Sequence, residues 1–116
     1  NVFVYNSKDK GLSVGESSSV ELKNIKLEKN NTAIAVKDNS KAFVKSVKFV
    51  NNEQQISAYK KNLQYGSGGD ASIIKSIFES DINIFSAKNS KIKIEDSKII
   101  GEIKKKGKEI YLNERK

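Results

Sequence analysis

The chain has 116 residues, 36% apolar and 31% charged, with a formal net charge of +8 at pH 7. This composition suits one soluble domain, and no apolar run approaches the ~20 residues that a membrane-spanning helix needs. The absence of cysteine and histidine excludes disulfides, thiolate catalysis, histidine general bases and the commonest zinc ligands, so we expect no metal or other cofactor.

The first apolar pair, Val2 and Val4, has the spacing of a short β-strand whose alternate side chains face one side. It matches a later pair, Val47 and Phe49, in its place relative to the repeat described next. We therefore expect it to be the tail of an earlier coil, so that the chain begins part-way round and is truncated at its N-terminal end.

From Leu12 onward one pattern recurs four times: an apolar pair, a polar turn, a second pair, two further residues and a third pair. The next repeats start at Ile34 and Ile56, each 22 residues on, and at Ile84, 28 residues on. Within a pair, apolar and outward residues alternate as in strands, and no helical period of 3.6 is present. Three short strands in about 22 residues predict an all-β fold, a parallel β-helix (solenoid) of about four to five coils.

The apolar pairs align in three columns, one for each strand of a coil. Each column should form one stacked parallel sheet, with its pairs facing the core. The first column holds Leu12/Val14, Ile34/Val36, Ile56/Ala58 and Ile84/Ser86; the second holds Val20/Leu22, Ala42/Val44, Ala71/Ile73 and Ile92/Ile94; the third holds Ile25/Leu27, Val47/Phe49, Ser76/Phe78 and Ser97/Ile99.

The turns between the predicted strands are rich in Asn, Asp, Ser and Gly. These residues tolerate tight corners because their side chains bond the local backbone or allow unusual dihedral angles. At one corner Asn30, Asn52 and Asp81 fall in register, and side chains stacked in this way can hydrogen-bond from coil to coil. We interpret them as structural rather than as a ligand site.

The third repeat carries an insertion between Tyr59 and Ala71. Loops that project from a rigid scaffold often carry binding residues, and two tyrosines with two lysines can stack on a sugar ring and hold an acidic group. The alternative is an insertion that the fold tolerates without a function. The candidate ligand-binding residues are Tyr59, Lys60, Lys61 and Tyr65.

A stripe of lysines occupies the outward position of the third strand, and Ile77 interrupts it. Stacked lysines about 4.8 Å apart repel one another unless an anion or an acid offsets the charge, so the stripe can track a polyanion. A solvated face is the alternative, because Arg115 is the sole arginine and built anion sites favour arginine. The polyanion-contact candidates are Lys23, Lys26, Lys45, Lys48 and Lys98.

Three apolar residues, Phe43, Ile74 and Phe85, stand at positions that the register turns outward. Single exposed apolar residues are normal on protein surfaces. A partner surface would require them to cluster.

The segment from Gly101 to Lys116 departs from the repeat and is highly charged, with one more alternating run at Ile110 and Leu112. Solenoids need a cap, because the last coil would otherwise present bare strand edges. We therefore divide the chain into coils over residues 1–100 and a C-terminal cap or tail over residues 101–116. The lysine run 104–106 is either an anion patch or a charged block to end-to-end stacking.

The repeat resembles that of right-handed parallel β-helix proteins of the pectin-lyase-like superfamily. The segments GLSVGESSSVELKNIKL, AIAVKDNSKAFVKSVKF and ISAYKKNLQYG are similar to β-helix modules found beside CotH-type kinase domains in bacterial surface and spore-coat proteins. The similarity covers residues 1–100. Because such modules are not known to carry the catalysis of their neighbours, the resemblance implies a binding or spacer role.

The wider superfamily contains polysaccharide lyases, hydrolases and epimerases, and the residues argue against each activity. Lyase-type sites resemble acidic calcium ligands with an arginine base, yet the sole arginine lies in the tail. Epimerase-type sites resemble an Asp-Pro-His motif, and proline and histidine are both absent. Hydrolase-type sites resemble groups of closely stacked aspartates. The register places the five aspartates of this chain at different corners: Asp9, Asp38, Asp70, Asp81 and Asp96.

We therefore expect a non-catalytic structural and binding module of a larger bacterial protein, extracellular or associated with the cell envelope. Carbohydrate is the favoured ligand class, a polysaccharide is the expected partner, and nucleic acid is disfavoured. One alternative is a fragment of a polysaccharide lyase or epimerase whose active site lies in a missing part. Another is an assembly element that self-associates through the open N-terminal end of the solenoid.

Overall fold

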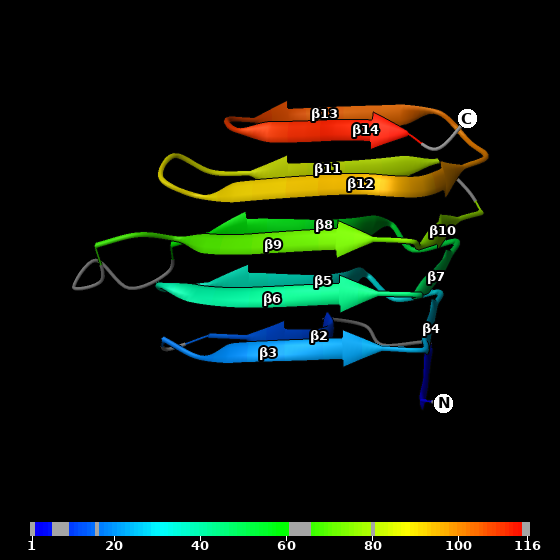
Figure 1. The fold of residues 1–116 in the computed structure, drawn as a ribbon, viewed down its shortest axis with the longest axis horizontal. Helices are drawn as coiled ribbons and strands as arrows, with labels where there is room; N and C mark the ends of the chain where they lie inside the picture. The colour runs from blue at the N-terminus through cyan, green and yellow to red at the C-terminus, as the bar shows by residue number, and fades with distance from the viewer. Residues whose placement is uncertain (1, 6–9, 16, 61–65, 80, 115–116) are drawn as a thin grey trace.

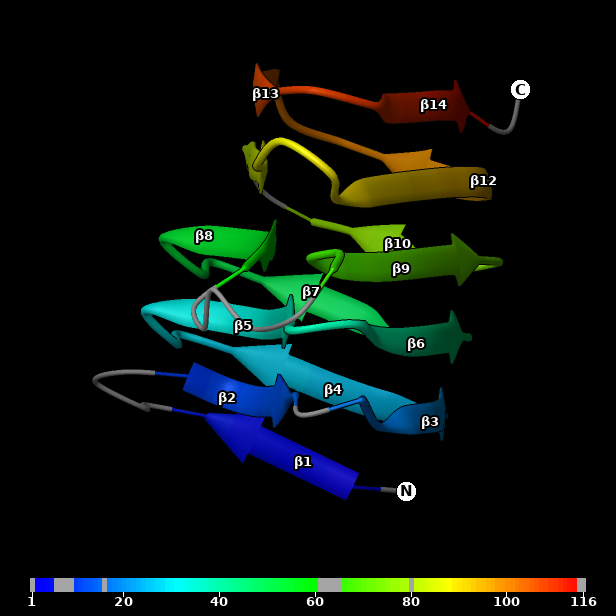
Figure 2. The same cartoon turned by 90° about the vertical axis from the view of Figure 1, so that its left-hand side faces the viewer.

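The computed structural model describes residues 2–5, 10–15, 17–60, 66–79 and 81–114. Over these residues every regular element is a β-strand, and the strands wind into a parallel β-solenoid of about four turns. Figures 1 and 2 show the coils stacked along one axis, with strands of successive coils side by side. The predicted fold class, a parallel β-helix with short strands, is confirmed.

One sheet has five strands in the order β13-β11-β8-β5-β2, and each neighbouring pair is parallel. It forms the rear layer in Figure 1. We call it the five-stranded sheet. Its strands are β2 (Lys10–Val14), β5 (Thr32–Lys37), β8 (Gln54–Tyr59), β11 (Ile82–Ser86) and β13 (Ile103–Gly107).

The other sheet has nine strands in the order β1-β4-β7-β10-β12-β9-β6-β3, with β14 also paired to β12. It has two wings, because the long strand β12 (Lys91–Ile99) runs through both. The front wing, nearest the viewer in Figure 1, holds β3 (Ser19–Lys23), β6 (Ser40–Lys45), β9 (Gly69–Ile74), the start of β12 and β14 (Ile110–Glu114). The side wing holds β1 (Val2–Tyr5), β4 (Ile25–Glu28), β7 (Lys48–Val50), β10 (Ile77–Phe78) and the end of β12.

The strand register matches the columns of apolar pairs. In the five-stranded sheet, Ile34 lies opposite both Leu12 and Ile56, and Ile56 opposite Ile84. The front wing aligns the second column and the side wing the third in the same way. Val2 lies opposite Ile25, which confirms that the first apolar pair belongs to the third strand of a coil.

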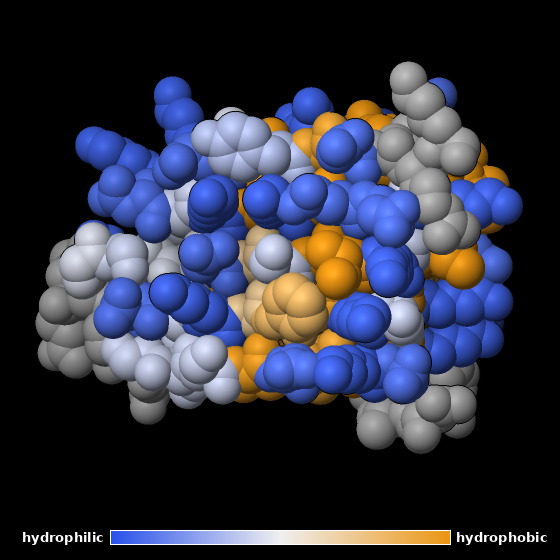
Figure 3. Space-filling view, in the orientation of Figure 1, coloured by the Kyte–Doolittle hydropathy of each residue, from blue (hydrophilic) through white to orange (hydrophobic). Residues whose placement is uncertain are grey.

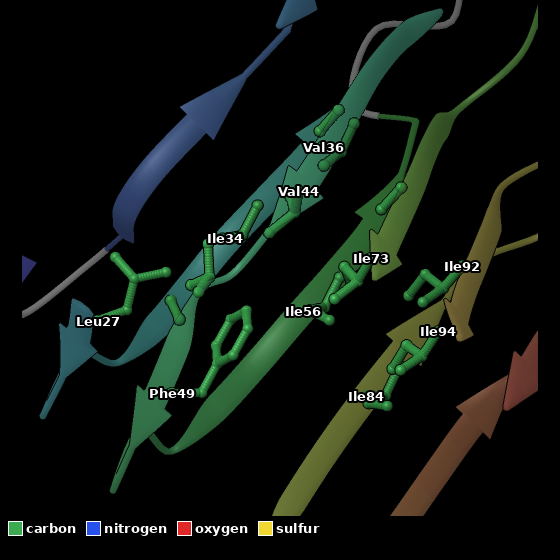
Figure 4. Packing of buried hydrophobic residues seen from close by; sticks show 14 of the residues in the cluster. Leu27, Ile34, Val36, Val44, Phe49, Ile56, Ile73, Ile84, Ile92 and Ile94 are labelled. Atoms are coloured by element: carbon green, nitrogen blue, oxygen red, sulfur yellow. The ribbon is translucent and has the colours of Figure 1, made fainter. Parts of the chain in front are cut away.

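The core fills the space between the sheets with the inward members of these columns (Figure 4). Leu27, Ile34, Ile56 and Ile73 are wholly buried, and burial of such a side chain contributes about 1.5–3 kcal/mol. The rings of Phe49 and Phe78 stack on neighbouring coils, with centroids 4.5 Å apart. The third column thus carries an aromatic pair where the other two carry aliphatic side chains.

The corner that precedes the five-stranded sheet holds a ladder of polar side chains. The backbone N–H of Asn30 donates to Oδ1 of Asn52 at 2.9 Å, and Nδ2 of Asn52 donates to the Leu27 carbonyl at 3.0 Å. One coil further on, Oδ1 of Asp81 accepts a bond from the N–H of Glu102 at 2.9 Å. The predicted coil-to-coil bonding is confirmed for Asn30 and Asn52, where it satisfies buried backbone groups, whereas Asp81 bonds the next coil at an exposed position.

The corner between the front and side wings has left-handed backbone in each coil. Asn24, Ser46, Lys75 and Asp96 have φ angles of 55°, 57°, 49° and 48°. Asn and Asp tolerate this region because their short polar side chains bond the local backbone. Lys75 lacks the short polar side chain that makes such a local bond. It directly precedes Ser76, whose hydroxyl accepts the N–H of Val47 at 3.2 Å.

The coils continue past residue 100. β13 pairs with β11, Ile103 opposite Ile82, and β14 pairs with β12, Ile110 opposite Ile92. The segment expected to be a cap therefore consists of two more solenoid strands, although it stands at the end of the stack as a cap would. The apolar pattern weakens there because Lys105 takes the position that Ile84 holds in the previous coil.

Candidate binding surfaces

The insertion of the third repeat lies between β8 and β9. Tyr59 is the last residue of β8 and is half-buried, as is Lys60. Lys61 and Tyr65 lie outside the described residues. The structure therefore brings Tyr59 and Lys60 together at the end of β8, and the four-residue ligand site predicted at this insertion stays a prediction.

The chain returns from the insertion through two buried glycines, Gly68 and Gly69. A Cβ atom at Gly69 would overlap the backbone carbonyl of Val36, and one at Gly68 would overlap Oγ of Ser90. The N–H of Gly68 donates to the Asn89 carbonyl at 2.9 Å, and the N–H of Gly69 donates to Oγ of Ser90 at 3.2 Å. Only glycine fits at these two positions. The contacts hold this end of the insertion, where the chain descends again to β9, against the neighbouring coils.

A hollow of about 350 Å³ lies beside this descending end. Amide and hydroxyl groups surround it, and Oγ of Ser67 donates to Oδ1 of Asn39 at 2.7 Å across one side. Two carboxylates, Asp70 and Glu109, and two lysines, Lys41 and Lys91, also line it. Such a mixture of donors and acceptors suits a neutral polar ligand better than a bare anion.

A second hollow of about 370 Å³ lies on the outer surface of the front wing. It shares Lys41, Asp70 and Lys91 with the first, so the two hollows adjoin each other at these side chains. We call the combined surface the front cleft. Its further lining comes from Ser19, Val20, Ala42, Phe43, Ser72 and Lys93.

A row of charged side chains crosses the middle of the front cleft. Lys41, Asp70 and Lys91 lie directly opposite one another on β6, β9 and β12. A carboxylate between two ammonium groups on adjacent strands is electrostatically favourable. A ligand in the cleft can therefore meet both a carboxylate and ammonium groups. Nζ of Lys91 also lies over the ring of Tyr111, 5.8 Å from its centroid.

A notch opens in the neighbouring outward row of the front wing. Phe43, Ser72 and Lys93 are opposite one another on successive strands, so the small Ser72 separates two bulky neighbours. Strands about 4.8 Å apart place Phe43 and Lys93 about 10 Å from each other. The ring of Phe43 is 39% exposed, and Figure 3 shows an apolar patch in the middle of this face, surrounded by hydrophilic side chains.

The predicted lysine stripe forms an aligned ladder on the side wing. Lys26 lies opposite Lys48, and Ile77 opposite both Lys48 and Lys98. Carboxylates offset part of its charge, because Nζ of Lys48 lies 3.2 Å from Glu79 and Nζ of Lys26 lies 3.9 Å from Glu28. Polyanion contact by the stripe stays a prediction.

The two flanking lysines lie opposite each other on the front wing. Lys23 pairs in register with Lys45, and Nζ of Lys23 lies 2.6 Å from Glu21. Exposed ion pairs of this kind contribute little to stability, about 0–1 kcal/mol. They nevertheless lower the local positive charge that a polyanion would meet.

Acidic side chains are dispersed, as the register predicts. Asp38 lies at the corner after β5, Asp81 at the corner before β11 and Asp96 within the bend of β12, while Asp70 lies in β9. Asp9 is outside the described part of the chain. Within that part, no three His, Cys, Asp or Glu residues come close enough together to hold a metal ion.

The front cleft is the site that reasoning from the sequence missed. Its signal lies in the outward positions of the second column, where Phe43, Ser72 and Lys93 are opposite one another. Phe43 was expected to face outward, but its neighbours in space became evident only once all outward rows were aligned. Ile74 and Phe85, the other two apolar residues expected outward, are half-buried.

Fold and surface together define this chain as a parallel β-solenoid protein with polar clefts on its outer faces. It matches no protein-family model, no curated protein and no solved structure. Across the residues with described positions, the structure has no helix long and apolar enough to cross a membrane.

Proposed function

We propose that this chain is a non-catalytic carbohydrate-binding solenoid module, part of a larger bacterial protein that is extracellular or associated with the cell envelope. The resemblance to pectin-lyase-like β-helices and to the modules beside CotH-type kinase domains supports the architecture and the setting. The front cleft supports the ligand class. Catalysis is not proposed, since the chain has no histidine and a single arginine in its tail.

The observation that carries the proposal is the pairing of an exposed aromatic wall with a polar floor. A sugar ring has an apolar face of C–H groups and an edge of hydroxyls, so it binds where an aromatic side chain adjoins placed hydrogen-bonding groups. Phe43 provides the wall. Asp70 and the amide and hydroxyl groups of the adjoining hollow provide acceptors and donors for the edge.

The notch over Ser72 also gives the front cleft a shape that accommodates a sugar ring. Because Ser72 stands between Phe43 and Lys93, a ring placed there contacts Phe43 on one side. Nζ of Lys93 lies 2.9 Å from Glu95, so Lys93 is partly neutralised. Binding at this notch should therefore depend on hydrogen bonds and ring contact more than on net charge, and should resist added salt.

The test is titration calorimetry of the purified chain against a panel of neutral and acidic oligosaccharides at low and high salt. Phe43→Ala should weaken binding to the preferred glycan about five- to tenfold, because an aromatic contact contributes ~1 kcal/mol or slightly more. Ile77→Ala is the matched control, since Ile77 is 38% exposed but lies on the side wing. It should leave affinity unchanged.

A Tyr59→Ala/Tyr65→Ala variant tests the insertion separately. If it alone abolishes salt-resistant binding while Phe43→Ala has no effect, the ligand binds the insertion and not the front cleft. If no glycan binds, or if the two variants at Phe43 and Ile77 behave alike, the proposed carbohydrate function of the cleft is wrong.

A further inference from the structure

Strand β13 ends the five-stranded sheet, on the side of the solenoid opposite the front wing (Figures 1 and 2). Three consecutive lysines of this strand line a hollow on its surface. Lys104 lies opposite Asn83, and Lys106 opposite Phe85, on the neighbouring strand β11. Asn83 and Phe85 are outward residues of β11, since Ile82 and Ile84 between and beside them are buried in the core. The two lysines therefore extend the outward rows of this face by one coil.

These side chains border a hollow of about 410 Å³. Its lining includes Gln54, Asn83, Phe85 and the three lysines Lys104, Lys105 and Lys106. We call this the β13 basic site. Its described lining residues include no carboxylate, whereas the front cleft contains Asp70 and Glu109.

Within the described part of the chain, no ion pair joins a lysine of the β13 basic site to an acidic side chain. Among residues with described positions, the ion pairs join Lys23, Lys26, Lys48 and Lys93 to glutamates. Lys104, Lys105 and Lys106 are all exposed. Lys104 and Lys106 project on the same face of β13, so their ammonium groups repel each other and an anion bound between them relieves that repulsion.

The neutral groups of the site are positioned for a sugar. Nδ2 of Asn83 donates to the Glu53 carbonyl at 2.8 Å, which fixes the amide and leaves Oδ1 to accept from a hydroxyl. The half-buried ring of Phe85 lies beside Lys106 and forms an apolar surface. An anionic group between Lys104 and Lys106, about 6–7 Å apart along the strand, would place the attached ring over Phe85.

We propose that the β13 basic site binds an acidic polysaccharide, with a carboxylate or sulfate group between Lys104 and Lys106 and the sugar ring against Phe85. The proposal is independent of the front cleft, because it concerns another face, other residues and a charged ligand. Nucleic acid fits less well. Single strands are typically bound by several aromatic side chains that stack on successive bases, and this site has one partly buried ring.

The test measures binding of three labelled dodecamers by fluorescence anisotropy at 20 and 200 mM salt: oligogalacturonate, a heparin-type sulfated oligosaccharide and oligothymidylate. The variant is Lys104→Gln/Lys106→Gln. Its matched control, Lys75→Gln/Lys88→Gln, lowers the net charge equally but removes exposed lysines that line none of the hollows described above. The site variant should weaken binding of an acidic oligosaccharide at least tenfold, and the control less than twofold.

Phe85→Leu separates a sugar site from a simple cluster of charge. It keeps an apolar side chain at a half-buried position and removes the ring, so it should weaken the oligosaccharide severalfold without changing the salt dependence. Two results overturn the proposal: equal losses in both lysine variants, which indicate a net-charge effect, and tighter binding of oligothymidylate than of either oligosaccharide. Because every probe here is anionic, failure of this site leaves neutral-glycan binding at the front cleft untouched.

Discussion

The middle coils and the last coil of the solenoid use the same positions for different residues. In the five-stranded sheet, Ile34 and Ile56 hold the inward position and are wholly buried, whereas Lys105 holds it in the last coil and is exposed. At the next inward position, β11 has the buried Ser86 and β13 has Gly107 opposite it. An inward position therefore requires an apolar residue only where coils cover it on both sides.

The front wing ends differently. Ile110 and Leu112 of β14 continue the apolar column of Ile92 and Ile94, but they are half-buried and pack at the margin of the core. The last coil is thus apolar on one sheet and charged on the other. The contrast with the middle coils can be measured residue by residue.

The largest contrast is expected between Phe49 and Leu112. Phe49→Ala should lower the free energy of unfolding by about 3–5 kcal/mol, because it removes a buried ring that stacks on Phe78 and leaves a cavity. Leu112→Ala should cost about 1–2 kcal/mol, since that side chain is already partly hydrated. Urea denaturation followed by circular dichroism measures both.

Phe49→Leu refines this prediction. It retains an apolar side chain in the middle coil but loses the stacked pair, so its cost should lie between those of the two alanine variants. Equal losses at Phe49 and Leu112 would mean that the last coil is as well covered as the middle ones.

The second contrast concerns the Asn30–Asn52–Asp81 corner. Asn52→Ala should cost about 1–3 kcal/mol, because it removes the buried side chain that accepts from the N–H of Asn30 and donates to the Leu27 carbonyl. Asp81→Ala should cost less than 1 kcal/mol, since Asp81 is exposed and water can replace it at the N–H of Glu102. Thermal melts of the two variants test whether the burial of the lost hydrogen bonds, rather than their position in the ladder, determines the loss of stability.

The sequence determines the inward columns of this fold unusually well. Ile34, Ile56 and Ile84 could be aligned without coordinates because parallel coils repeat one set of inward positions at nearly fixed spacing. The amide ladder of Asn30 and Asn52 was predictable for the same reason. Its chemistry is local to one corner, and its partner lies one repeat away.

The outward surfaces were harder to predict for two physical reasons. Phe43, Ser72 and Lys93 come from three different repeats, and nothing in their local sequences requires a notch. The repeat was also expected to end at residue 100, because the segment that follows is highly charged and departs from the apolar pattern. Strand β13 nevertheless joins the sheet, because its backbone hydrogen bonds to β11 form whatever the polarity of its side chains.

The smallest expected effect on stability comes from Lys105→Ile, which gives the last coil the residue type of the middle coils. Lys105 is exposed, so the free energy of unfolding should change by no more than about 0.5 kcal/mol. Self-association should change more. Among the described strands β13 is at the edge of its sheet, and a lysine on an edge strand opposes pairing with another chain.

Sedimentation at several protein concentrations should therefore detect more dimer for Lys105→Ile than for the unsubstituted chain. Lys88→Ile, which adds the same side chain at an exposed turn, should not associate. An unsubstituted chain that already dimerises while Lys105→Ile adds nothing would instead favour contact through the N-terminal edge strands β2 and β3, where Leu12, Val20 and Leu22 are half-buried. In that case the charge at Lys105 is a consequence of exposure and not a barrier to stacking.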